Sequence, residues 1–149
     1  MNDTQKYKRI VVKIGSSTMT HGTGKLNLFR LETLARVLSD LKNEGREIIL
    51  VSSGAVQAGT AKINFHRPTC TREKQALAAI GQNEIMKIYG KFFSLFGYTV
   101  AQLLLTRDVI DNPARRAAAE DTFAELLSLG CVPIVNENDP ISCYELEFG

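Results

Sequence analysis

The chain alternates short apolar runs with helix-prone segments, and this alternation limits its possible folds more than any other feature. Four aliphatic runs are expected to be strands: residues 9–14, 47–51, 98–105 and 131–135. Helices are expected between these strands. One follows Asn27, where leucines recur at helical spacing, a second covers the helix-prone segment 72–96, and a third begins at the Asn-Pro pair 112–113. The order predicts an α/β fold, a three-layer αβα sandwich around a mainly parallel sheet.

Three positions within these segments predict particular local structure. The continuous apolar run at 9–14 is typical of a strand covered on both faces. Gly81, inside the segment 72–96, predicts a break or kink in that helix. Pro133 predicts that its strand is short, or that its nitrogen faces no ladder acceptor. Residues 141–149 resemble the start of a further strand or hairpin.

Composition restricts the class of protein. With 149 residues, 44% of them hydrophobic, one domain with a core of its own is expected. The 18 basic and 16 acidic residues nearly cancel, so no nucleic-acid partner is expected. No stretch approaches the ~20 apolar residues of a membrane helix, so no membrane partner is expected. The polar first residues form no signal peptide, and three cysteines without a CxxC pair favour a reduced, cytoplasmic setting.

Small polar residues follow each predicted strand. They occupy residues 15–17, 52–55, 106–108 and 136–139. In an open parallel sheet, ligands bind beyond the carboxyl ends of the strands, which all meet at one edge. The sequence therefore predicts a binding site at that edge.

Lys13 stands inside the first strand, two residues before Gly15. A lysine is rarely buried without a partner, so Lys13 is placed to reach over the strand end towards an anion. Backbone amides at Gly15 and the helix start after Gly54 add positive charge, which suits phosphate or carboxylate. The alternative is equally open: Lys13 extends into solvent from an edge strand, and Gly15 only turns the chain.

The segment Asn136–Asp139 is the densest group of polar side chains. Its carboxylates and amide oxygens could bind an ammonium group, whereas an Asx-type turn would use the same side chains to hold the loop. We expect both roles to be shared among them. No metal ligand is predicted, since His21 and His66 are far apart and lack metal-ligand spacing.

Taken together, these motifs resemble the amino acid kinase family. The matching stretches are residues 11–17, 51–56, 74–82, 101–106, 132–139 and 145–149. They cover almost the whole chain, and their joint occurrence in this order is specific. The Ser-Gly turn at 53–54 together with Asn136–Asp139 resembles the members that act on glutamate. The chain departs from the family pattern at Ala118, where asparagine is common.

The resemblance implies an activity, its substrates and a set of site residues. The activity would be phosphorylation of the γ-carboxylate of L-glutamate by ATP with Mg²⁺, the first step of proline biosynthesis, carried out by a homo-oligomer. By matching position, the resemblance implies that Lys13, Gly15 and Ser16 bind ATP and that Lys13 is the catalytic lysine. The implied glutamate-binding residues are Ser53, Gly54, Asn136 and Asp139, the last of which would hold the amino group.

The resemblance extends over the amino-terminal, glutamate-binding part of the family's domain, so residues 1–149 are expected to form that part. In the family an Asp-Asn-Asp stretch and a nucleotide-binding half with a second lysine follow. We therefore expect this chain, which ends at Gly149, to be truncated and not to turn over ATP alone. The alternatives are a non-catalytic binding or assembly module, including a decayed paralogue, and a kinase for another small carboxylate.

Overall fold

The computed structural model describes residues 7–142, which form four strands and six helices. The strands are β1 (Arg9–Lys13), β2 (Glu47–Val51), β3 (Val100–Leu105) and β4 (Val132–Glu137). The helices are α1 (Ser16–Met19), α2 (Leu28–Asn43), α3 (Ala55–Lys62), α4 (Thr71–Leu95), α5 (Arg107–Asp111) and α6 (Pro113–Ser128). The element expected at 141–149 lies, from residue 143 on, outside the described residues.

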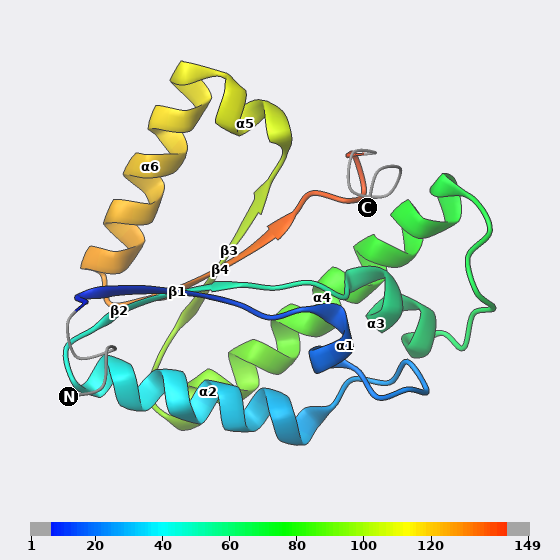
Figure 1. Cartoon of the computed structure of the whole chain (residues 1–149), viewed down its shortest axis with the longest axis horizontal. Helices are drawn as coiled ribbons and strands as arrows, with labels where there is room; N and C mark the ends of the chain where they lie inside the picture. The colour runs from blue at the N-terminus through cyan, green and yellow to red at the C-terminus, as the bar shows by residue number, and fades with distance from the viewer. Residues whose placement is uncertain (1–6, 143–149) are drawn as a thin grey trace.

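The described strands form one parallel sheet with the order β1-β2-β4-β3. The chain advances in one direction from β1 through β2 to β3 and then returns to β4. If all crossovers have the same hand, this reversal puts the helices before β4 on the opposite face from α2 and α4. Figure 1 shows this arrangement, with α2 and α4 on one side of the sheet and α6 on the other. The predicted α/β class and its three layers are confirmed.

The core lies between the sheet and the helices α2 and α4. Its largest fully buried side chains are Tyr89, Phe93, Met19, Leu31, Ile48, Leu50, Ile85, Ile134 and Val132. On the other face α6 packs over β4 and buries only Leu127 of its own residues. In β1 every second residue is exposed, and Val11 is 60% exposed. The prediction that the first strand is covered on both faces is therefore wrong, because α6 does not extend over β1.

Local sequence signals set several element ends. Asn27 caps α2 by accepting a hydrogen bond from the Arg30 N–H at 3.1 Å, and Asn112 caps α6 in the same way. Val132 and Asn138 donate their backbone N–H groups to carbonyls on the β3 side of β4. By alternation the Pro133 nitrogen faces β2, whose pairing with β4 begins only at the next residue. This confirms that Pro133 stands where no ladder donor is needed.

Two predictions about these elements are wrong. Helix α4 runs unbroken through Gly81, because that glycine accommodates a close crossing with α3 instead of interrupting the helix. Strand β4 continues to Glu137, so Asn136 and Glu137 belong to the strand and not to the loop after it. The short helices α1 and α5 were not predicted; residues 15–17 and 106–108 carry only turn-like signals.

Candidate functional site: a cleft at the carboxyl ends of the strands

A cleft of about 320 Å³ crosses the carboxyl ends of all four described strands. Its lining comes from Lys13 of β1; Val51, Ser52 and Ser53 at the end of β2; Leu105, Thr106, Arg107 and Ile110 beyond β3; and Val135, Asn136 and Glu137 of β4. Three of the predicted site residues, Lys13, Ser53 and Asn136, thus lie around one cavity although they are far apart in the sequence. The predicted location of the site at this edge of the sheet agrees with the cleft.

Lys13 is an exposed side chain at the end of β1. In the parallel register it lies beside Val51, and the Ile14 N–H donates to the Val51 carbonyl at 2.9 Å. This pairing puts the lysine next to the Ser52-Ser53 turn. No carboxylate between residues 7 and 142 lies within ion-pair distance of its ammonium group. Lys13 therefore combines both readings of the sequence: it extends from an edge strand, and it lines the cleft as an unpaired cation.

The turn after β2 packs against the turn after β1. Gly54 has a φ of +83°, a left-handed conformation that favours glycine. A Cβ placed on Gly54 would lie 3.5 Å from the Cα of Ser16, so there is room for little more than a methyl group between the two turns. Gly15 and Ser16, predicted as a phosphate-binding turn, form the start of α1. Together with Gly54 they stand beside the cleft and are not among its lining residues.

A buried group of side chains holds the end of β2 in place. The Ser52 Oγ lies 3.3 Å from the Met19 Sδ and 3.3 Å from the Tyr89 hydroxyl. Burial raises the pKa of Tyr89 to about 12, so its hydroxyl stays protonated and can donate. Sequence reasoning missed this group. Tyr89 lies within the helix-prone segment 72–96, and nothing local links it to a serine 37 positions away.

The end of β4 contributes one amide that is already held on both sides. The Asn136 Nδ2 donates to the Gln82 Oε1 at 2.9 Å, and its Oδ1 accepts from the Glu137 N–H at 2.9 Å. Glu137 in turn accepts a hydrogen bond from the Ser142 hydroxyl at 2.6 Å. As expected, some of these side chains hold the local backbone. Gln82 lies in a stretch used only for the family resemblance, with no role predicted for it.

Asp139 is a buried carboxylate two residues beyond β4, with 8% of its surface exposed. It is not a lining residue of the cleft. Burial raises its pKa to about 6, and the neighbouring Glu137 carboxylate adds to the rise. Within the described part of the chain, no hydrogen bond or ion pair reaches its side chain. A cationic ligand group would supply the partner that Asp139 lacks there.

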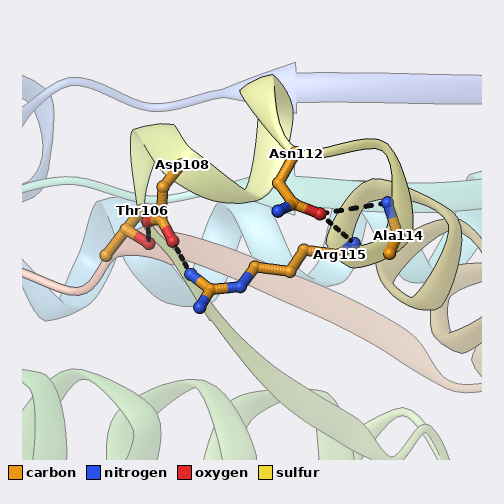
Figure 2. A network of polar contacts seen from close by, with 5 residues as sticks. All are labelled: Thr106, Asp108, Asn112, Ala114 and Arg115. Carbon is orange, nitrogen blue, oxygen red and sulfur yellow. Dashed lines mark hydrogen bonds and ion pairs between the residues drawn. The ribbon is translucent and has the colours of Figure 1, made fainter.

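The corner where β3 leads into α5 forms one wall of the cleft. Thr106 and Arg107 line the cleft, and Figure 2 shows how this corner is braced. Asp108 accepts hydrogen bonds from the Thr106 hydroxyl and the Arg115 guanidinium, while Asn112 caps α6. This network ties α5 to α6, so the wall is held by local contacts.

Residues 7–142 hold neither a metal-binding cluster nor a membrane-spanning helix. They contain no group of three His, Cys, Asp or Glu side chains that could hold a metal ion. None of their helices combines the length and the apolar character needed to cross a bilayer.

An open parallel sheet with helices on both faces and a cleft at the carboxyl ends of its strands defines the α/β class whose members bind ligands at that edge. The sequence pattern of the amino acid kinase family matches residues 8–147, and the chain belongs to this family.

Among known relatives, the chain is similar to bacterial proteins named glutamate 5-kinase. It is 52% identical to the one from Listeria innocua over 141 residues, which is 94% of this chain and 51% of the relative. The Clostridium perfringens protein is 51% identical, with 94% of this chain and 52% of the relative covered. The Enterococcus faecalis protein is 49% identical over 147 residues, with 98% and 54% covered. The chain thus spans about half the length of these relatives.

Proposed function

We propose that this chain is the acceptor-binding part of a glutamate 5-kinase, which binds L-glutamate for phosphorylation of its γ-carboxylate. The observation that carries the proposal is the convergence of Lys13, Ser53 and Asn136 on one cleft, at the sheet edge where the α/β class binds ligands. The similarity to glutamate 5-kinases over 94–98% of the chain supports the choice of substrate.

The charges around the site suit an amino acid as acceptor. Asp139, buried and without a cation among the described residues, would hold the ammonium group of glutamate. Ser53 and the turn at Gly54 would meet its carboxylates, with Asn136 donating from the neighbouring strand β4. Because a carboxylate is already ionised near neutral pH, the acceptor needs no general base.

Lys13 would act on the transferred phosphoryl group. In the proposed reaction an oxygen of the γ-carboxylate forms a bond to the γ-phosphorus of ATP, and the bond from that phosphorus to the ADP oxygen breaks. The transition state is anionic, so catalysis depends on positioning and positive charge. An unpaired ammonium group at the rim of the cleft supplies that charge, and Gly15 and Ser16 at the start of α1 would flank the phosphates.

The charges of the described cleft residues fit the phosphoryl end of ATP. Lys13 and Arg107 both line the cleft, whereas residues 7–142 contain no metal-binding cluster. A magnesium ion would be held mainly by phosphate oxygens, as is common for this ion. Bound in that way, it would supply positive charge to the transferred phosphoryl group.

A trapping assay tests the proposed reaction. The chain, alone and joined to the unmatched half of the Listeria innocua protein, is incubated with ATP, L-glutamate and hydroxylamine, which converts an acyl phosphate into a hydroxamate. We expect glutamyl hydroxamate from the joined protein and none when Lys13 is replaced by alanine. A joined protein that folds and hydrolyses ATP but forms hydroxamate equally well without Lys13 contradicts the assigned role.

One observation favours a second candidate, an assembly module. A groove between α6 and the strands β1 and β2 is lined mainly by apolar side chains, among them Val11, Ile49, Val51 and Phe123, together with the charged Arg9 and Glu120. Such a surface is suited to another protein surface, including a second copy of this chain. Sedimentation analysis with and without L-glutamate separates the candidates: self-association that L-glutamate leaves unchanged, together with no glutamate binding, would favour assembly over substrate recognition.

A further inference from the structure

Gln82 is a buried carboxamide on α4 in contact with the cleft residue Asn136. Only 6% of Gln82 is exposed, and its Oε1 accepts a hydrogen bond from the Asn136 Nδ2 at 2.9 Å. Its own Nε2 is buried and has no hydrogen-bond partner among residues 7–142. A buried donor without an acceptor lowers the stability of a fold. Stability alone therefore does not account for a glutamine at this position.

The backbone determines which atoms of the two amides face each other. The N–H of Glu137 can only donate, so the group of Asn136 that meets it at 2.9 Å is the oxygen. The Asn136 nitrogen then faces Gln82, and Gln82 must present its oxygen. Turning either amide over would oppose two donors or two acceptors. Asn136 is thereby left with its oxygen engaged and one N–H free of Gln82.

We propose that Gln82 is a positioning residue that makes Asn136 a hydrogen-bond donor towards the cleft. A donor at this point suits the oxygen of a carboxylate or a phosphoryl group and excludes the ammonium group of an amino acid. The identity of the ligand rests on the proposed function: Asn136 would meet a carboxylate oxygen of L-glutamate, and the ammonium group would go to Asp139.

The helix crossing supports this role, because it links the supports of two neighbouring strand ends, those of β2 and β4. Gly81, the residue before Gln82, contacts the backbone of Ala55, and α3 begins directly after the Ser53-Gly54 turn. The same crossing therefore sets the position of Gln82 under β4 and of the turn after β2. A shift of either helix would move both ligand-facing groups together.

The test uses the full 149-residue chain with the variants Q82M, Q82E, N136A, Q82M/N136A and S39A. NMR measures hydrogen exchange of the Asn136 side-chain amide, and calorimetry measures L-glutamate affinity and melting temperature. In Q82M we expect exchange and the Kd for L-glutamate each to rise about tenfold, the scale of one hydrogen bond to a charged group, without a lower melting temperature. Q82E keeps an oxygen towards Asn136 and should recover most of the protection of its amide from exchange.

Two comparisons separate positioning from general packing. Q82M should add little to the Kd in the N136A background, since its effect passes through Asn136. S39A removes the other buried polar atom without a partner in the described residues and should change neither readout. The inference would be overturned if Q82M left amide exchange and L-glutamate affinity unchanged. It would also be overturned if Q82M raised the Kd as much in the N136A background as in the wild type. A wild-type chain with a protected Asn136 amide and no glutamate binding would contradict the proposed function, while the Q82M exchange rate would still decide the role of Gln82.

Discussion

Gly81 of α4 lies so close to Ala55 of α3 that a Cβ on Gly81 would stand 1.7 Å from the Ala55 carbonyl oxygen. The contact is reciprocal, because a Cβ on Gly59 of α3 would stand 1.9 Å from the Leu77 carbonyl oxygen of α4. Two glycines thus let the two helix backbones touch. Since α3 starts at the turn that follows β2, this crossing sets the position of one wall of the cleft.

Replacing Gly81 with alanine is expected to lower the free energy of unfolding by about 2–4 kcal/mol, because the clash is with backbone that cannot move aside. Gly90 provides a control in the same helix: a Cβ there would meet nothing closer than the Val100 Cγ2 at 3.9 Å. Gly90→Ala should raise stability by roughly 0.5–1 kcal/mol, since alanine favours helix. Urea unfolding measures the free energy of unfolding of both variants. Equal changes in Gly81→Ala and Gly90→Ala would contradict the close crossing of α3 and α4.

The same glycine illustrates what sequence reasoning can and cannot give. The composition of the segment around Gly81 correctly predicts a helix, but helix propensity alone misinterprets the glycine. Its actual reason is a contact with Ala55, 26 positions earlier by sequence number, which no local pattern contains. The covering of β1 was mispredicted for a related reason, because which strands α6 reaches depends on the order of the strands in the sheet.

Replacing Lys13 with methionine is expected to leave the fold intact and weaken anion binding. The side chain is exposed and has no ion-pair partner in the described region, so the stability change should stay within about 0.5 kcal/mol. Titration with inorganic phosphate at saturating L-glutamate should show a loss of about tenfold in affinity. Lys87→Met, an exposed lysine on α4, serves as control. Equal phosphate affinities for the two variants would remove Lys13 from the phosphoryl site.

Asp139 predicts a distinct pH dependence of stability. Its pKa in the fold is about 6, above the value of 3.8 for an unperturbed aspartate, so the folded state binds the proton more tightly. The stabilising contribution is complete below about pH 4 and is lost as the pH rises through about 6. Between pH 4 and pH 8, the free energy of unfolding of Asp139→Asn should therefore rise by about 1–3 kcal/mol relative to that of the wild type.

Urea unfolding across this pH range measures the difference, with Asp121→Asn on the exposed surface of α6 as control. The control should follow the wild-type pH profile. If the stability of Asp139→Asn ran parallel to that of the wild type across this pH range, burial would not be raising the pKa of the Asp139 carboxyl.

Tyr89→Phe tests the buried group that holds the end of β2. Loss of the hydroxyl near Ser52 should cost about 0.5–1.5 kcal/mol of stability, the usual net value of one buried hydrogen bond. Tyr98→Phe is the matched control, because its hydroxyl bonds to Asn43 at the surface. Thermal unfolding should show the larger loss for Tyr89→Phe, and the reverse order would contradict a bracing role.

The candidate site could be predicted from sequence where its residues stand at or just beyond the carboxyl ends of strands. Lys13, Ser53 and Asn136 could be brought together from strand ends alone, because a parallel sheet collects those ends at one edge. Tyr89 and Gln82 could not, since they lie in mid-helix and reach the cleft through contacts with Ser52 and Asn136. The supporting residues of this site depend on how α4 packs under the sheet, which periodicity does not specify.

An NMR titration of the isotope-labelled chain with L-glutamate tests whether these residues bind an amino acid. We expect saturable shifts at Ser53, Asn136 and Asp139, an affinity at least tenfold weaker in Asp139→Asn, and no comparable response to a simple dicarboxylate that lacks the ammonium group. Absence of saturable shifts, or shifts confined to the separate cavity near Gly24 and Arg67, would contradict this expectation.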